Sequence, residues 1–77
     1  MSKALEAVKR VQGNATDPNI WTITRNDRVY DRVDHTTHTV VQIARSLADD
    51  MPNDLWQVWD SNCELVYAVG PVGSVKP

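Results

Sequence analysis

The sequence predicts an α+β domain: an N-terminal helix, then a β-hairpin, a helix and a second β-hairpin. The hairpins would form a four-stranded, mainly antiparallel sheet with a helix packed on one face. Two observations predict this fold. Apolar residues recur at helical spacing over 3–12 and 40–51. Short β-branched and aromatic runs, joined by turn residues, fill 20–33 and 55–69.

Length and composition favour one folding unit. The chain has 77 residues, of which 42% are apolar and 23% charged, which is ordinary usage for a globular domain. Either half alone would bury too little apolar surface to fold. We therefore expect a single compact domain over residues 1–70. Residues 71–77, which contain two prolines and no periodicity, are expected to form an extended or flexible tail.

The first helix is expected to start after Ser2, whose hydroxyl can cap the first turn, and to run to about Gln12. Gly13-Asn14 supplies the left-handed stop. A helix of about ten residues does not persist alone in water, so it must dock on the rest of the domain or stay frayed. Its apolar stripe is narrow and consists of Ala4, Leu5, Ala7, Val8 and Val11.

The first hairpin is expected to pair residues 20–24 with residues 28–33 around the turn Asn26-Asp27. Its register stays open. A two-residue loop places Trp21 and Ile23 on the face of Tyr30 and Arg32. A three-residue loop places them with Val29 and Val33 instead, on an apolar face that only Asp31 interrupts.

The second helix has the most regular pattern in the sequence. Asp34-His35-Thr36-Thr37 offers several capping oxygens ahead of it, and Pro52 ends it because proline disfavours a helical residue before it. Its apolar positions are Val40, Ile43, Ala44, Leu47, Ala48 and Met51.

The second hairpin is expected to pair residues 55–59 with residues 64–69. The turn Asp60-Ser61-Asn62-Cys63 has type I character and would be closed by a positive φ at Cys63, where glycine is usual. A left-handed cysteine costs on the order of 1 kcal/mol, so a Cys63→Gly change should stabilise the protein.

Both faces of the second hairpin are expected to be apolar. Period-two geometry places Trp56, Val58, Val66 and Ala68 on one side, and Leu55, Trp59, Leu65 and Tyr67 on the other. The second helix would cover one face. The other needs the first helix, a second copy of the chain or a foreign partner to cover it.

Catalytic and metal-binding motifs are not evident. His35 and His38 could share one face of a helix start, but two histidines do not complete a zinc site, and the only cysteine, Cys63, lies in a distant turn. No serine or cysteine is spaced for a catalytic triad, and no glycine-rich phosphate loop occurs. We therefore expect no enzymatic activity, no metal and no cofactor.

The chain is expected to be cytoplasmic. A single cysteine forms no internal disulfide, the N-terminus lacks the apolar run of a signal peptide, and no stretch is apolar enough for a membrane span. Residues 1–33 carry a net charge of +2 and residues 34–77 one of −4. Nucleic-acid binders usually carry a stronger basic excess, so this balance makes nucleic acid the less favoured partner.

Three functions remain. The first is a non-enzymatic protein-binding module in which sheet aromatics bind the partner and acidic residues steer it; its candidate residues are Trp59, Tyr67, Leu65, Asp49 and Asp50. The alternative is a small nucleic-acid-binding regulator that uses the basic first hairpin through Arg25, Arg28, Arg32 and Tyr30. The third is a homodimer that buries its own second face.

In size and layout the chain is similar to the small accessory proteins of phages and mobile elements. Some of those, anti-CRISPR proteins among them, act by stoichiometric binding to a host protein. The resemblance implies a regulator that binds its target stoichiometrically and works by occlusion or by scaffolding.

Overall fold

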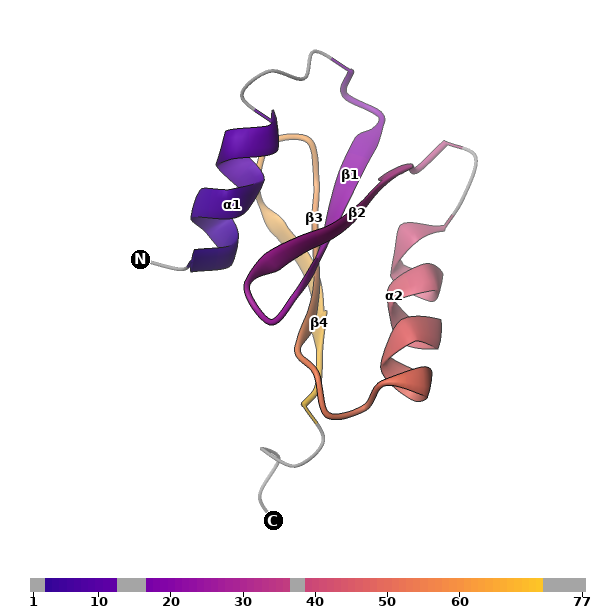
Figure 1. Cartoon of the computed structure of the whole chain (residues 1–77). Coiled ribbons are helices and arrows are strands. Elements are labelled where there is room, and N and C mark those ends of the chain that lie inside the picture. Colours follow the sequence, from indigo (N-terminus) through magenta and orange to yellow (C-terminus); the bar gives the residue numbers. More distant parts are fainter. Residues whose placement is uncertain (1–2, 13–16, 37–38, 72–77) are drawn as a thin grey trace.

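A computed structural model describes residues 3–12, 17–36 and 39–71 and confirms the expected α+β fold. The elements are α1 (Lys3–Gln12), β1 (Ile20–Arg25), β2 (Arg28–Asp34), α2 (Val40–Asp50), β3 (Trp56–Trp59) and β4 (Leu65–Val69). The four strands form one sheet in the order β2-β1-β3-β4, and each neighbouring pair is antiparallel. The two helices lie on opposite faces of the sheet, which gives three layers (Figure 1).

α2 covers one face of the sheet with the stripe that the sequence predicts. Val40, Ala44 and Ala48 are buried against Ile23 and Val58, and they share one hydrophobic core with Trp56. The helix ends at Asp50, directly before Met51-Pro52, as expected.

The expected capping of α2 by residues 34–36 is wrong. The N-cap is Thr39, and its side chain makes no capping hydrogen bond. The Asp34 carboxylate instead accepts hydrogen bonds from the Thr36 backbone nitrogen (2.9 Å) and hydroxyl (2.6 Å), so it closes a local Asx turn. Thr37 lies outside the described residues.

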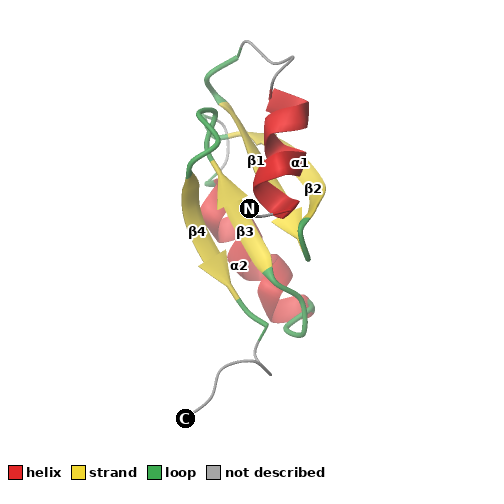
Figure 2. Cartoon of the chain, turned by 90° about the vertical axis from the view of Figure 1, so that its left-hand side faces the viewer, coloured by secondary structure: helices red, strands yellow, loops and turns green. Residues whose placement is uncertain are grey.

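α1 covers the opposite face, and its expected end at Gln12 is confirmed. Ser2 and Gly13-Asn14 lie outside the described residues. Ala4 and Val8 are buried against Trp59, which is 5% exposed. α1 lies across this face of the sheet (Figure 2). Of the alternatives for covering the second face, the first helix is therefore the one observed at Trp59.

Gln12 connects the end of α1 to β1, to β2 and to the turn between β3 and β4. Its amide nitrogen donates to the backbone oxygens of Ile20 and Asp60, at 3.2 Å each. Its side-chain oxygen accepts a hydrogen bond from Arg32 Nη2 at 2.9 Å. A buried amide with both ends paired stabilises the docked helix, whereas an unpaired one would destabilise it.

The first hairpin combines the two registers that the sequence left open. The turn has two residues, Asn26 and Asp27, with φ of 51° and 69°, and Arg25 pairs with Arg28. A β-bulge then shifts the register, so that Trp21 pairs with Val33. Tyr30 is the extra residue of this bulge, which lets a two-residue loop coexist with the Trp21–Val33 pairing expected from a three-residue loop. Val29, which the three-residue loop would place with Trp21, pairs with Thr24 instead.

The second hairpin has the predicted turn. Cys63 has a φ of 64°, and its backbone nitrogen donates to the Asp60 oxygen at 3.1 Å. The predicted pairing beyond the turn is wrong, because a bulge at Val66 shifts the register between Val58 and Trp59. Tyr67 therefore faces α2 and packs against its core, together with Val69.

The α1 face of the sheet is mixed rather than apolar. Thr22 and Thr24 are fully buried there, and Trp59 Nε1 donates to Thr24 Oγ1 at 3.0 Å. Thr22 Oγ1 and Gln57 Oε1 are buried without a hydrogen-bond partner among the described residues. The expectation of two apolar faces thus holds only for the face beneath α2.

Candidate binding surfaces

The exposed large hydrophobic side chains of the described chain lie on the two outer strands. They are Tyr30 on β2 (45% exposed) and Leu65 and Val66 on β4 (49% and 43%). Tyr30 and Val66 are the extra residues of the two bulges. Each hairpin therefore presents an apolar side chain where its outer strand departs from regular pairing.

β4 is an uncharged outer strand. Its sequence is Leu-Val-Tyr-Ala-Val, and Leu65, Val66 and Ala68 are exposed. Natural proteins usually protect such edges with charged residues, prolines or bulges, because unpaired backbone groups accept another strand. Here the bulge at Val66 is the only one of these devices within the strand itself.

Hydrogen-bond alternation identifies which backbone groups β4 offers. Asn26 N donates to Leu55 O at 2.9 Å, so the backbone groups of Leu55 point towards β1. In an antiparallel ladder every second residue points the same way, which places those of Gln57 and Trp59 towards β1 as well. Their partners on β4 are Ala68 and Leu65. The N–H and C=O groups of Ala68 and Leu65 therefore point to the open edge.

At the opposite edge, β2 carries Arg28 and the exposed Tyr30, and Arg25 lies beside them on β1. Arg25 and Arg28 face each other across the turn, and both line a hollow of about 410 Å³ with Asn26, Val29 and Tyr30. The Tyr30 ring meets the buried Trp56 ring edge to face, with centroids 4.9 Å apart. Three of the four residues predicted for nucleic-acid binding thus meet at one hollow.

Arg32, the fourth, lies apart from this group. It pairs with Thr22 on the α1 face and donates to Gln12. Its guanidinium is used in fastening α1, so the sequence interpretation that grouped it with the other two arginines is wrong. The bulge at Tyr30 is the cause, because it changes which face the following residues occupy.

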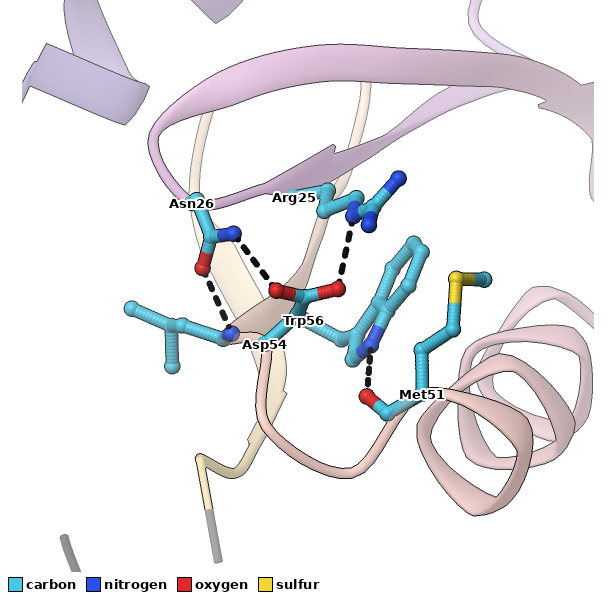
Figure 3. A network of polar contacts seen from close by, with 6 residues as sticks. Arg25, Asn26, Met51, Asp54 and Trp56 are labelled. Carbon is cyan, nitrogen blue, oxygen red and sulfur yellow. Dashed lines mark hydrogen bonds and ion pairs between the residues drawn. The ribbon is translucent and has the colours of Figure 1, made fainter. Parts of the chain in front are cut away.

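Asp54 holds Arg25 in place (Figure 3). Its Oδ2 accepts a hydrogen bond from Arg25 Nε, and its Oδ1 one from Asn26 Nδ2, each at 2.8 Å. The guanidinium carbon of Arg25 lies 5.6 Å from the Trp56 ring centroid, a cation–π distance. Trp56 is itself fixed through its Nε1, which donates to Met51 O at 3.1 Å.

The same contacts lower the pKa of Asp54. The hydrogen bond from Asn26 is the largest cause, and the hydrogen bond and positive charge of Arg25 act in the same direction, while partial burial opposes them. The Asp54 side chain is 19% exposed, so water screens part of this effect. Neither Asp54 nor Asn26 was expected from the sequence to position Arg25, because their contact joins residues 28 apart in the chain.

A second hollow, of about 560 Å³, joins the hairpin tip to α1. It shares Arg28 and Val29 with the first hollow. Lys3 and Arg10 add positive charge to it, and Glu6 and Asp27 oppose them. Apart from Arg28, the charges that line this second hollow therefore cancel.

The residues predicted for protein binding do not form one surface. Trp59 is buried beneath α1, whereas Tyr67 is partly buried and packs against the core beneath α2, so the two rings lie on opposite faces of the sheet. Leu65 is exposed, as the hypothesis requires. Asp49 and Asp50 are exposed at the end of α2. Val66 was not expected to face solvent, because nothing in the sequence marks the bulge.

The described residues contain no group of three or more histidine, cysteine or carboxylate side chains arranged to hold a metal. His35 stacks on Trp21, with ring centroids 4.7 Å apart, and His38 lies outside the described part. Among the described helices, neither has the length and apolarity needed to cross a membrane.

Searches with protein-family models, curated proteins and solved structures found no significant match to this chain.

Proposed function

We propose that this protein is a non-enzymatic protein-binding module whose partner adds an extended segment to the open edge of β4. The observation that carries the proposal is the uncharged strand with Leu65 and Val66 about half exposed. Strand addition obtains affinity from backbone hydrogen bonds and selectivity from side-chain contacts. Leu65, the one exposed apolar member of the predicted protein-binding set, lies on this strand.

The bulge favours selective binding over non-specific association at this edge. In a regular strand the outward backbone groups recur every two residues, whereas here they belong to Leu65 and Ala68, three residues apart. A partner strand must accommodate this spacing to bond at both positions. The bulge therefore discourages general edge-to-edge pairing while leaving a defined pattern of donors and acceptors.

Charge favours a basic partner. Residues 34–77 carry a net charge of −4, and the exposed Glu64 directly precedes β4. Asp49 and Asp50 add to this field from α2, so they contribute to steering rather than to the contact itself. We propose an apolar extended segment flanked by lysine or arginine, bound one to one, which would let the protein block or recruit its target as small accessory proteins do.

The test changes β4 and an unrelated surface in parallel. Val66→Lys places a charge on the edge, and Gln42→Lys places the same charge on the exposed face of α2. Proteins captured from cells that encode this chain would be identified by mass spectrometry, and the purified partner would be titrated by calorimetry. We expect Val66→Lys to weaken binding about tenfold or more, and Gln42→Lys to leave it unchanged.

Ala68→Pro is a second variant at the same site. It removes a hydrogen-bond donor that points outward, so it costs no bond within the sheet and should also weaken the partner. Equal binding by wild type and both β4 variants, with folding checked by circular dichroism, would contradict the proposal. A concentration-dependent dimer that Val66→Lys dissociates would show that the edge binds a second copy instead.

A further inference from the structure

The edge of the sheet opposite β4 carries the hollow lined by Arg25, Arg28 and Tyr30. Arg25 and Arg28 are direct partners across the hairpin. Like charges directly opposite each other on neighbouring strands are destabilising. Asp54 neutralises Arg25 but not Arg28, and no described acidic residue forms an ion pair with Arg28. The pair thus carries one uncompensated positive charge.

Arg25 is held before any ligand arrives. Its Nε donates to Asp54 Oδ2 at 2.8 Å, and its guanidinium carbon lies over the Trp56 ring, 5.6 Å from the centroid. Within the described chain, no group accepts a hydrogen bond from its terminal amino groups, and the side chain is 42% exposed. A fixed guanidinium with two open amino groups suits a planar or tetrahedral anion, because little side-chain entropy is lost on binding.

Tyr30 supplies a flat apolar contact beside this charge. It is the bulge residue of β2, is 45% exposed, and is braced by its edge-to-face contact with Trp56. Exposed aromatic rings next to arginines commonly bind unpaired nucleotides. The base stacks on the ring, and the arginine contacts the phosphate. The hollow of about 410 Å³ is in the usual size range of small-ligand sites.

We infer that this hollow binds a nucleotide, with the phosphate between Arg25 and Arg28 and the base against Tyr30. The nucleotide is either free or part of a single strand. Beyond Arg28 the second hollow adds Lys3 and Arg10, and Glu6 and Asp27 offset both, so further phosphates gain little. The site does not involve β4, and its failure would leave the proposed protein-binding function unaffected.

The experiment measures fluorescence anisotropy of a short labelled oligodeoxythymidine at low salt, with thymidine monophosphate and unlabelled duplex DNA as separate competitors. Arg28→Gln removes the uncompensated charge, and Arg45→Gln removes the same charge from the exposed face of α2. We expect Arg28→Gln to weaken binding about tenfold, and Arg45→Gln to change it by less than about twofold. Tyr30→Ser should weaken binding several-fold, and circular dichroism checks that it stays folded.

Competition distinguishes a site for free nucleotides from a site for single-stranded nucleic acid. Displacement by the monophosphate identifies a free-nucleotide site, and binding that only the strand achieves identifies a single-strand site; either supports the inference. Three outcomes would overturn it: no binding by the wild type, equal losses with Arg28→Gln and Arg45→Gln, or displacement by duplex DNA as effective as by single strands.

Discussion

At the scale of single residues, Cys63 is the clearest case of backbone strain. Its φ of 64° lies in the left-handed region, where a Cβ atom costs about 1–2 kcal/mol and glycine costs none. The turn type dictates this geometry, because the residue that closes a type I turn into a hairpin must reverse the chain direction. That is why the strain could be predicted from the order Asp-Ser-Asn-Cys without coordinates.

Two substitutions isolate this strain. Cys63→Ala and Cys63→Gly both lose the sulfur that packs near Trp59, and only the glycine variant loses the Cβ atom. We expect Cys63→Gly to exceed Cys63→Ala in free energy of unfolding by about 1 kcal/mol, measured by urea denaturation. Equal stability of the two variants would show that the turn relaxes to another conformation in solution.

Asp54 makes the free energy of unfolding depend on pH in the acidic range. Its pKa is lowered in the folded protein, so the ionised carboxylate stabilises the fold above the unfolded pKa of about 3.9. That contribution is lost as the pH falls from about 4 through the lower, folded pKa. We expect wild type to lose stability in this window and Asp54→Asn to show a shallower dependence, measured by urea denaturation at a series of pH values. The same pH dependence of stability in wild type and Asp54→Asn would contradict the lowered pKa of Asp54, and with it the ion pair with Arg25.

At the scale of elements, the bulges decide what the strands expose. In each hairpin the turn was predictable from its residues, and so were the approximate strand limits. The extra residues Tyr30 and Val66 were not, because a bulge is selected by packing across the sheet and has no fixed local sequence. The errors at Tyr67 and Arg32 both follow from these one-residue shifts, since one residue turns every later side chain to the other face.

Deleting Val66 should convert β4 into a regular edge. The pairs Trp59–Leu65, Val58–Tyr67 and Gln57–Ala68 would all be retained, and the outward groups of Leu65 and Ala68 would become two residues apart. We expect the deletion variant to self-associate with rising concentration in sedimentation experiments, because a flat uncharged edge accepts a second strand.

Val66→Ala is the matched control, since it shortens the exposed side chain and keeps the extra residue. It should behave like wild type. If the deletion variant sediments identically to Val66→Ala, the bulge has no protective role.

At the scale of the whole molecule, the sequence predicted the layers better than the surfaces. Helical periodicity identified both helices, and the short length of α1 left two possibilities, docking on the domain or fraying, of which docking is observed. The residues that contact a partner could not be identified from the sequence, because their exposure depends on which half of the sheet face α1 covers. α1 reaches Trp59 and leaves Leu65, Val66 and Ala68 exposed, a distinction set by tertiary contacts such as those of Gln12.

The three-layer arrangement also distributes the tryptophans. Trp56 is sealed in the layer beneath α2, and Trp59 in the layer beneath α1. The third, Trp21, is partly buried and packs on the α2 side, so Trp21 and Trp56 report on the α2 interface and Trp59 on the α1 interface. Lifting of α1 alone would shift the emission of Trp59 to longer wavelength while Trp21 and Trp56 keep their surroundings. The optical signal itself can therefore tell a partly opened molecule from an unfolded one.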